Sequence, residues 1–93
     1  MRVLIVTLDL RLPGCRSLKE RRHVLEPLKQ RLRRDLNLSV SEVAPGGGRE
    51  SARLGIAAVV EHAAAGDAQL SRLTAIVERE PRVVVVDQSA EYW

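Results

Sequence analysis

The chain has 93 residues, of which 45% are hydrophobic and 29% are charged, so it is long enough for one small core and is not disordered in composition. The formal net charge is +3 and the sequence pI is about 9.8, a mildly basic balance that alone says little about a partner. Its distribution says more, because nine of the fifteen basic residues lie between Arg11 and Arg34 and thirteen of the fifteen are arginine, the better bidentate ligand for phosphate.

A single cysteine, Cys15, excludes an intramolecular disulfide and a metal site built from several cysteines, which suits a reducing compartment. The first apolar run, Met1–Val6, is too short for a signal peptide, and no run approaches the roughly 18 apolar residues of a membrane span. We therefore expect one cytoplasmic domain over residues 1–93, with no membrane, cofactor or metal.

Residues 2–12 alternate in polarity, which predicts a strand. One face is wholly apolar, from Leu4 to Leu12, and the other is apolar only in its first half. Pro13-Gly14 ends this strand. Ser17 and Glu20 then form a Ser-x-x-Glu capping box at the start of a helix that we expect to reach Leu36.

The helix after Ser17 carries one apolar stripe, with Val24 at its edge, made of Leu18, Leu25, Leu28, Leu32 and Leu36. Arg21 falls inside this stripe, and we expect its stem to lie over the core while its head reaches water. Pro27 lies on the opposite side, where we expect it to kink the helix or to split it near His23.

The rest of the chain predicts two more strands, a helix and a last strand. Residues 38–43 alternate, Pro45–Gly48 form a turn, and 53–62 alternate again, which favours a hairpin. Gly66-Asp67 begins a helix that Pro81 stops, with a stripe of Leu70, Leu73, Ile76 and Val77. The β-branched run within 82–87 predicts the last strand, and 88–93 form a tail or extend that strand.

This β-α-β-β-α-β order predicts an α+β, ferredoxin-like fold. Two right-handed crossovers would place both helices on one face of a four-stranded antiparallel sheet, with the first and third strands central. The other face of the sheet is then open.

The open face predicts an interface. Its apolar candidates are Val3, Ile5, Ala57 and Val59, beside Thr7 and two of the four valines 83–86. A contiguous apolar patch on an open sheet is typical of assembly, so we expect a homodimer or larger homo-oligomer through this face or through edge strands. The alternative is a modest exposed patch on a monomer. The two central strands have no aromatic residue, which argues against base stacking on the sheet.

Four basic residues of the first helix, Lys19, Arg22, Lys29 and Arg33, project within about 80° of one another, and Arg16 extends them at the helix entry. Arg49 and Arg53 are candidates to join from the hairpin. This set predicts phosphate contacts with RNA or the ribosome. The alternative is an ordinary solvated helix face that also carries Glu20 and Glu26.

No catalytic constellation is visible. Gly46–Gly48 is not followed by the Lys-Ser or Lys-Thr of a phosphate-binding P-loop. Cys15 precedes a helix N-terminus, but His23 is about two turns further on, and His62 has no ligand spacing to His23. Asp9, Glu42 and Glu61 fit salt bridges to arginine better than acid–base chemistry. An enzyme is the least favoured hypothesis.

The block Pro13-Gly14-x-x-Ser17-Leu18-Lys19-Glu20, with the later segments 38–43 and Leu54-Gly55-Ile56-Ala57, resembles the small bacterial YlxP-like family of unknown function. The resemblance covers nearly the whole chain. It implies a ferredoxin-like fold in a cytoplasmic bacterial protein. Family genes tend to lie beside those of translation initiation and ribosome maturation factors, so the resemblance also implies a ribosome or RNA role by association.

Overall fold

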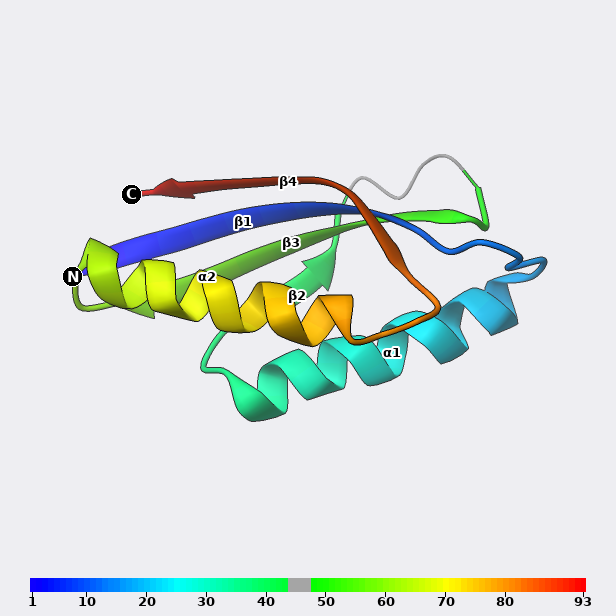
Figure 1. Cartoon of the computed structure of the whole chain (residues 1–93), viewed down its shortest axis with the longest axis horizontal. Coiled ribbons are helices and arrows are strands. Elements are labelled where there is room, and N and C mark those ends of the chain that lie inside the picture. The colour runs from blue at the N-terminus through cyan, green and yellow to red at the C-terminus, as the bar shows by residue number, and fades with distance from the viewer. Residues whose placement is uncertain (44–47) are drawn as a thin grey trace.

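The computed structural model describes residues 1–43 and 48–93. Its elements follow in the order β1 (Arg2–Arg11), α1 (Leu18–Asp35), β2 (Ser39–Glu42), β3 (Ser51–Val60), α2 (Ala63–Glu78) and β4 (Val84–Tyr92). The sheet is antiparallel in the order β2-β3-β1-β4, with both helices on one side of it (Figure 1). The predicted ferredoxin-like topology, with the first and third strands central, is confirmed.

The core lies between the sheet and the helices, and the alternation of β1 places it there. Leu4, Val6, Leu8 and Leu10 are all 2% exposed or less, and Leu12 follows them into the interior. The β3 residues that lie opposite these four, Ala58, Ile56, Leu54 and Ala52, are also buried. Each buried leucine contributes about 1.5–3 kcal/mol relative to an exposed one, so this face fixes the register of the sheet.

α1 begins as the capping box predicts. Ser17 Oγ accepts from the amide of Glu20 at 3.1 Å, and the Glu20 carboxylate accepts from the amide of Arg16 at 2.8 Å. Leu18 was predicted in the apolar stripe but is 67% exposed, because the first turn extends beyond the end of the core. Of the two alternatives for Pro27, the split of the helix near His23 is wrong, because α1 is one helix, and the kink stays a prediction; Pro27 lies on the exposed side of α1.

α2 begins at Ala63, three residues before the expected start at Gly66. Nδ1 of His62 accepts from the amide of Ala65 at 3.1 Å, so His62 serves as the N-cap, and three alanines supply the first turn. Of the predicted stripe, Leu73 and Val77 are buried.

Glu80, just beyond α2, is a buried carboxylate with 6% exposure. It accepts from Nε of Arg82 at 2.9 Å, from the amide of Arg82 at 3.1 Å and from Arg31 of α1 at 3.3 Å. These bonds, led by the one from the Arg82 side chain, hold the pKa of Glu80 below its ordinary value, against the opposing effect of burial. Glu80 therefore ties the end of α2 to the C-terminal part of α1.

The strand bounds differ from the expected ones at β2, β3 and β4. β2 is shorter than 38–43, β3 is shifted to begin at Ser51, and β4 runs through the segment that the sequence left as a tail or an extension. Pairing with β1 explains the length of β4, since Leu4 lies opposite Tyr92. Of the predicted Pro45–Gly48 turn, residues 45–47 lie outside the described residues, and Gly48 has a φ of 94°.

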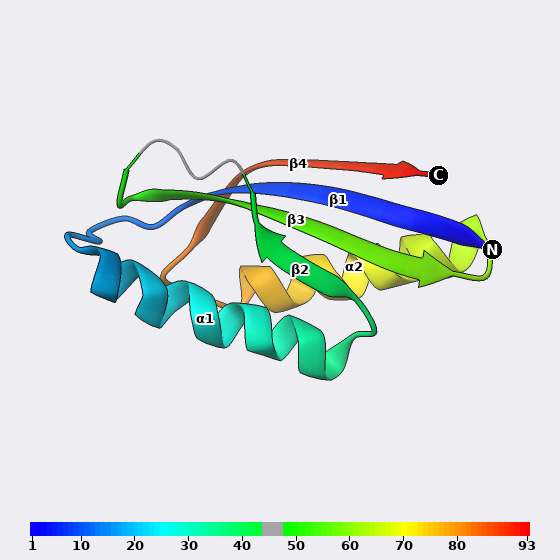
Figure 2. The same cartoon turned by 180° about the vertical axis from the view of Figure 1, so that it is seen from behind.

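β2 and β4 are the two edges of the sheet. Figure 2 shows the β2 edge above α1, and Figure 1 shows the β4 edge with both termini at the same end of the molecule. Among the described residues, no helix is long and apolar enough to cross a membrane.

Candidate nucleic-acid interface

Two of the basic residues predicted on α1 are engaged by neighbouring groups. Nζ of Lys29 lies 2.7 Å from Oε1 of Glu26, and the Lys29 side chain is only 13% exposed. This hydrogen bond, with the nearby charges of Lys29, Arg33 and Arg22, holds the pKa of Glu26 below its ordinary value. Nη2 of Arg33 donates to the carbonyl of Val40 at 2.9 Å, so Arg33 anchors β2 to α1.

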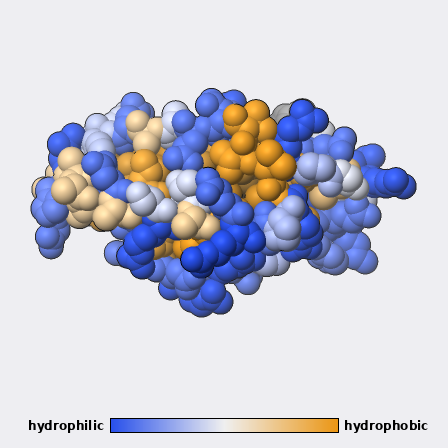
Figure 3. All heavy atoms as spheres, in the orientation of Figure 1, coloured by the Kyte–Doolittle hydropathy of each residue, from blue (hydrophilic) through white to orange (hydrophobic). Residues whose placement is uncertain are grey.

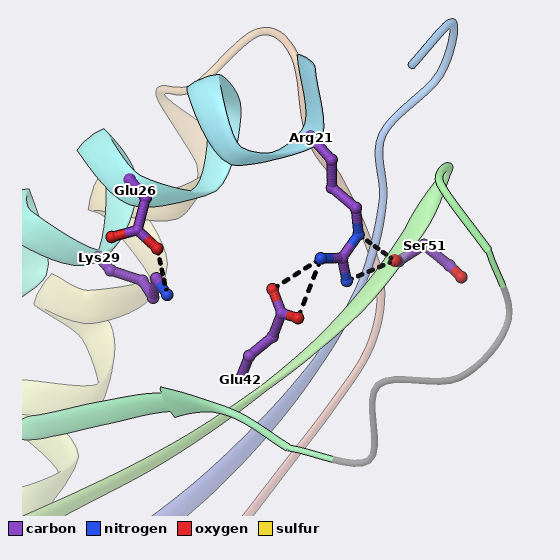
Figure 4. A network of polar contacts seen from close by, with 5 residues as sticks. All are labelled: Arg21, Glu26, Lys29, Glu42 and Ser51. Carbon is purple, nitrogen blue, oxygen red and sulfur yellow. Dashed lines mark hydrogen bonds and ion pairs between the residues drawn. The ribbon is translucent and has the colours of Figure 1, made fainter. Parts of the chain in front are cut away.

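A recess of about 250 Å³ separates this part of α1 from β2. Its charged lining residues are three cations and two anions: Arg21, Arg22, Lys29, Glu26 and Glu42. Figure 4 shows Arg21 reaching from α1 toward Glu42 while Lys29 turns back to Glu26. Two of the three cations in this recess are therefore paired with the protein's own carboxylates, and Arg22 forms no ion pair among the described residues.

The guanidinium of Arg21 was expected to reach water, but it binds protein groups instead. Its Nη1 donates to both carboxylate oxygens of Glu42 at 2.9 Å, and its Nε and Nη2 donate to the carbonyl of Ser51 at 3.2 and 3.1 Å (Figure 4). The guanidinium thus joins α1 to the end of β2 and to the start of β3. Its position inside the leucine stripe signalled a side chain directed at the sheet, but the sequence alone did not name the acceptors.

The beginning of α1 presents cations of a different kind. Arg16, Lys19 and Arg22 are exposed, and in residues 1–43 and 48–93 none of them forms an ion pair. At the helix entry Ser17 Oγ accepts from the amide of Glu20, and the Glu20 carboxylate accepts from the amide of Arg16. Two amides are therefore satisfied within the chain, and the exposed charges here are those of the three side chains.

Arg49 and Arg11 lie at the same end of the molecule. The carbonyl of Glu50 accepts from the amide of Leu12 at 2.7 Å, and Oε1 of Glu50 accepts from the amide of Gly14 at 3.0 Å. These bonds fasten the β1–α1 connection beside Arg49, which is exposed. Arg11, which the sequence did not nominate, is also exposed and ends β1. We call these cations the basic end: Arg11, Arg16, Lys19, Arg22 and Arg49.

Arg53 lies on the open face of the sheet, away from α1, and so does not join the helix cations. Residues of β1 and β3 that lie opposite each other share a face, and Arg53 is paired in register with Asp9. Its Nε lies 2.6 Å from Oδ1 of Asp9, and this bond raises the pKa of the Arg53 guanidinium. The pair lines a shallow groove of about 410 Å³ with Arg11, Ser51 and Val86.

The open face divides into an apolar end and a charged end. Val3, Ile5, Ala57 and Val59 lie together near the termini, and Val59 is 61% exposed. Trp93 joins them, because its backbone exchanges two hydrogen bonds of 2.9 Å with Val3, and it is 74% exposed. We call these residues the apolar end: Val3, Ile5, Ala57, Val59 and Trp93.

The expectation that two of the valines 83–86 would adjoin these residues is wrong. Val84 lies opposite Arg11 and Glu91 lies opposite Ile5, because β4 is longer than expected and contains an irregularity where β1 passes Asp9. Val84 and Val86 are exposed at the bend of β4 instead, where Figure 3 shows a hydrophobic cluster.

Cys15 and His23 border one recess of about 300 Å³, together with Glu20 and Arg82. Within the described residues no hydrogen bond joins Cys15 to His23, and Glu20 is engaged by the Arg16 amide. His62 caps α2 at the other end of the molecule. The described part of the chain therefore assembles no nucleophile–base pair, and it contains no cluster of three metal-ligating side chains.

The comparisons with known proteins give a fold and a family. A de novo designed protein with a ferredoxin fold, LFR1 1, solved by solution NMR, is similar with a TM-score of 0.59 and 8% identity, over 98% of this chain and 86% of that chain. At this identity the likeness shows the fold alone. No curated protein matches the sequence.

The family expectation is confirmed at the level of an uncharacterised domain family, and the YlxP-like label stays a prediction. The family model described as "Protein of unknown function (DUF503)" matches residues 3–90. Since this match spans nearly all of the sequence, the chain belongs to the DUF503 family.

Proposed function

We propose that this protein is a non-enzymatic, cytoplasmic RNA-binding module associated with the ribosome, and that its basic end contacts RNA phosphates. The observation that carries the proposal is the placement of five exposed cations from three chain segments on one end of the molecule, without carboxylate partners in the described structure. A cation that has no carboxylate partner in the protein loses no ion pair when it binds phosphate, so its net gain in binding free energy is the largest.

The other candidates have a secondary role in this proposal. Lys29 would leave Glu26, Arg33 would leave the Val40 carbonyl, and Arg53 would leave Asp9 before binding phosphate. Each exchange trades one charge-assisted bond for another, so the net gain is small. The primary contacts are therefore Arg16, Lys19 and Arg22, supported by Arg11 and Arg49.

The test is a charge-reversal triple variant, Arg16→Glu, Lys19→Glu and Arg22→Glu. Lys19 lies in the first turn of α1, where glutamate suits the helix dipole, and Arg16 and Arg22 are exposed, so the fold is expected to persist by circular dichroism. Affinity for ribosomal RNA is expected to fall at least about 100-fold, and the slope of log affinity against log salt to flatten by roughly 2–3.

A second triple variant, Arg34→Glu, Arg72→Glu and Arg79→Glu, makes the same change in net charge on the outer side of the helices. It is expected to bind far more tightly than the first variant. Equal losses in both triple variants would mean that RNA responds to net charge alone, and unchanged binding in the first variant would refute the basic end as the site.

A second candidate function is self-assembly through the apolar end. The observation that favours it is Trp93, whose exposed ring continues the row of Val3 and Val59. Replacing both Ile5 and Val59 by Asp is expected to convert oligomers to monomers in light scattering, whereas Ala64→Asp with Ala68→Asp on exposed α2 leaves the mass unchanged. A wild-type monomer at high concentration would exclude this candidate.

A further inference from the structure

The aromatic side chains and the basic end lie at opposite ends of β1. Tyr92 and Trp93 are the only aromatic residues of the chain, and they pair with Leu4 and Val3 at the start of β1. Arg11 ends the same strand. Eight residues of extended chain separate Val3 from Arg11, about 26 Å at the rise of a β-strand.

Tyr92 is also engaged inside the molecule. Its ring lies over Gly66 of α2, and the Arg2 guanidinium lies 5.4 Å from the ring centroid. Proteins that bind single strands combine a positive groove with aromatic side chains on which successive bases stack, at about 1–3 kcal/mol per base. The basic end carries positive charge, but it has no Tyr or Trp side chain on which a base can stack.

The cations of the basic end also come from two layers. Arg11 projects on the open face of the sheet, whereas Arg16, Lys19 and Arg22 belong to the helix layer on the other side. A single strand threaded along the surface would follow one row of cations. Phosphates on the two strands of a helix can meet both layers at once, and duplex RNA is read mainly through such backbone contacts and its shape.

We infer that the RNA bound by the basic end is double-stranded, with its phosphates contacted from both layers and no base stacked on the protein. This inference rests on the proposed function and narrows its ligand class. The imidazole of His23 is the ring nearest to these cations in sequence, and it borders the recess with Glu20 and Arg82. Because His23 is exposed, the His23→Ala variant below tests whether a base stacks on it.

The experiment measures fluorescence anisotropy with an RNA duplex of about 20 base pairs, longer than the roughly 16 that a double-stranded RNA-binding domain covers. Each separated strand is measured in the same low-salt buffer. The duplex is expected to bind at least about 10-fold more tightly than either strand. The Arg16, Lys19, Arg22 triple variant is expected to lose duplex binding, whereas Trp93→Ala and His23→Ala change it less than about twofold.

Three outcomes overturn the inference. Single strands that bind as tightly as the duplex, or a loss of about fivefold or more in Trp93→Ala or His23→Ala, would refute it while leaving RNA binding by the basic end intact. Absence of binding to all three RNAs at low salt would refute the proposed function together with the inference. The first two outcomes and the third are thus distinguished in one series of titrations.

Discussion

The ring of Tyr92 lies directly on the backbone of Gly66, in the first turn of α2. A Cβ built on Gly66 would come within 2.5 Å of Cε1 of Tyr92, closer than real Cβ atoms approach. The Tyr92 hydroxyl donates to Asp67 and lies 3.0 Å from the carbonyl oxygen of Ala63, and the Asp67 carboxylate raises the pKa of the phenol. The last residues of β4 are therefore fastened to the start of α2 at a site where any residue larger than glycine must displace the Tyr92 ring.

Replacing Gly66 by Ala is expected to destabilise the protein by about 1–3 kcal/mol, because the new methyl group must displace the Tyr92 ring. In a Tyr92→Ala background the sign should reverse, since alanine within a helix is favoured over glycine by about 1 kcal/mol. Urea denaturation of the four proteins of this cycle measures both values. Equal effects of Gly66→Ala in the two backgrounds would contradict the contact.

The contact between Tyr92 and Gly66 was not predicted from the sequence, and the early start of α2 shows why. Gly66-Asp67 has the composition of a helix start, and His62 is not among the preferred N-caps. The register of β4 against β1 brings Tyr92 over the chain at residue 66, and a contact between residues 26 positions apart leaves no periodic signal. Local patterns predicted that the helix exists, and tertiary packing determined where it begins.

Arg21→Met is expected to cost about 1–3 kcal/mol of stability, because it leaves a partly buried Glu42 carboxylate without its cation and removes two donors from the Ser51 carbonyl. Methionine retains the stem that packs beside the leucines. Chemical denaturation measures the loss. The matched control is Arg34→Met, whose ion pair with Asp35 is exposed, and its effect on the free energy of unfolding should be much smaller. Equal effects would show that the Arg21 contacts add nothing to the fold.

The ionisation of Glu80 makes the stability of the protein depend on pH in the acid range. The pKa of Glu80 in the folded state lies below its unfolded value near 4.5, so the folded state binds fewer protons than the unfolded state. The ionised carboxylate therefore stabilises the fold fully above the unfolded pKa. This contribution to stability is lost as the pH falls through the folded pKa. Glu80→Gln is expected to lower the melting temperature at pH 7 and to converge with the wild type at strongly acid pH. Thermal melts from pH 7 to pH 2 measure the difference, and a gap that widens on acidification would contradict this role.

Sequence periodicity predicted the apolar face of β1 and the leucines of α1 well, because burial repeats every two residues in a strand and at i, i+3 and i+4 in a helix. It treated the cations of α1 as one set. In the structure Lys29 is paired with Glu26 and lines the recess toward β2, whereas Lys19 is exposed and does not line it. Leu18 differs from Leu25 for the related reason that the sheet does not extend under the first turn. The helical angle predicts which residues lie on the same face of a helix, but it does not predict which residues of other elements that face contacts.

Asp9→Asn tests whether RNA bound at the basic end extends onto the open face. The substitution keeps the size of the side chain, removes the charge that holds Arg53, and leaves that guanidinium beside Arg11 in the same groove. The free energy of unfolding should change little, because both partners are substantially exposed. Affinity for RNA is expected to rise about 3- to 10-fold, with a salt slope steeper by about 0.9 for one added phosphate contact.

Asp35→Asn is the matched control, because it removes one negative charge and one exposed ion pair, with Arg34, at the C-terminal end of α1. Its affinity for RNA should change by less than about twofold at the same ionic strength. A gain in Asp35→Asn as large as that in Asp9→Asn would assign the effect to net charge. No gain in Asp9→Asn would show that the RNA contacts on the open face do not extend from Arg11 to Arg53, and Arg53 would then be a structural partner of Asp9 alone.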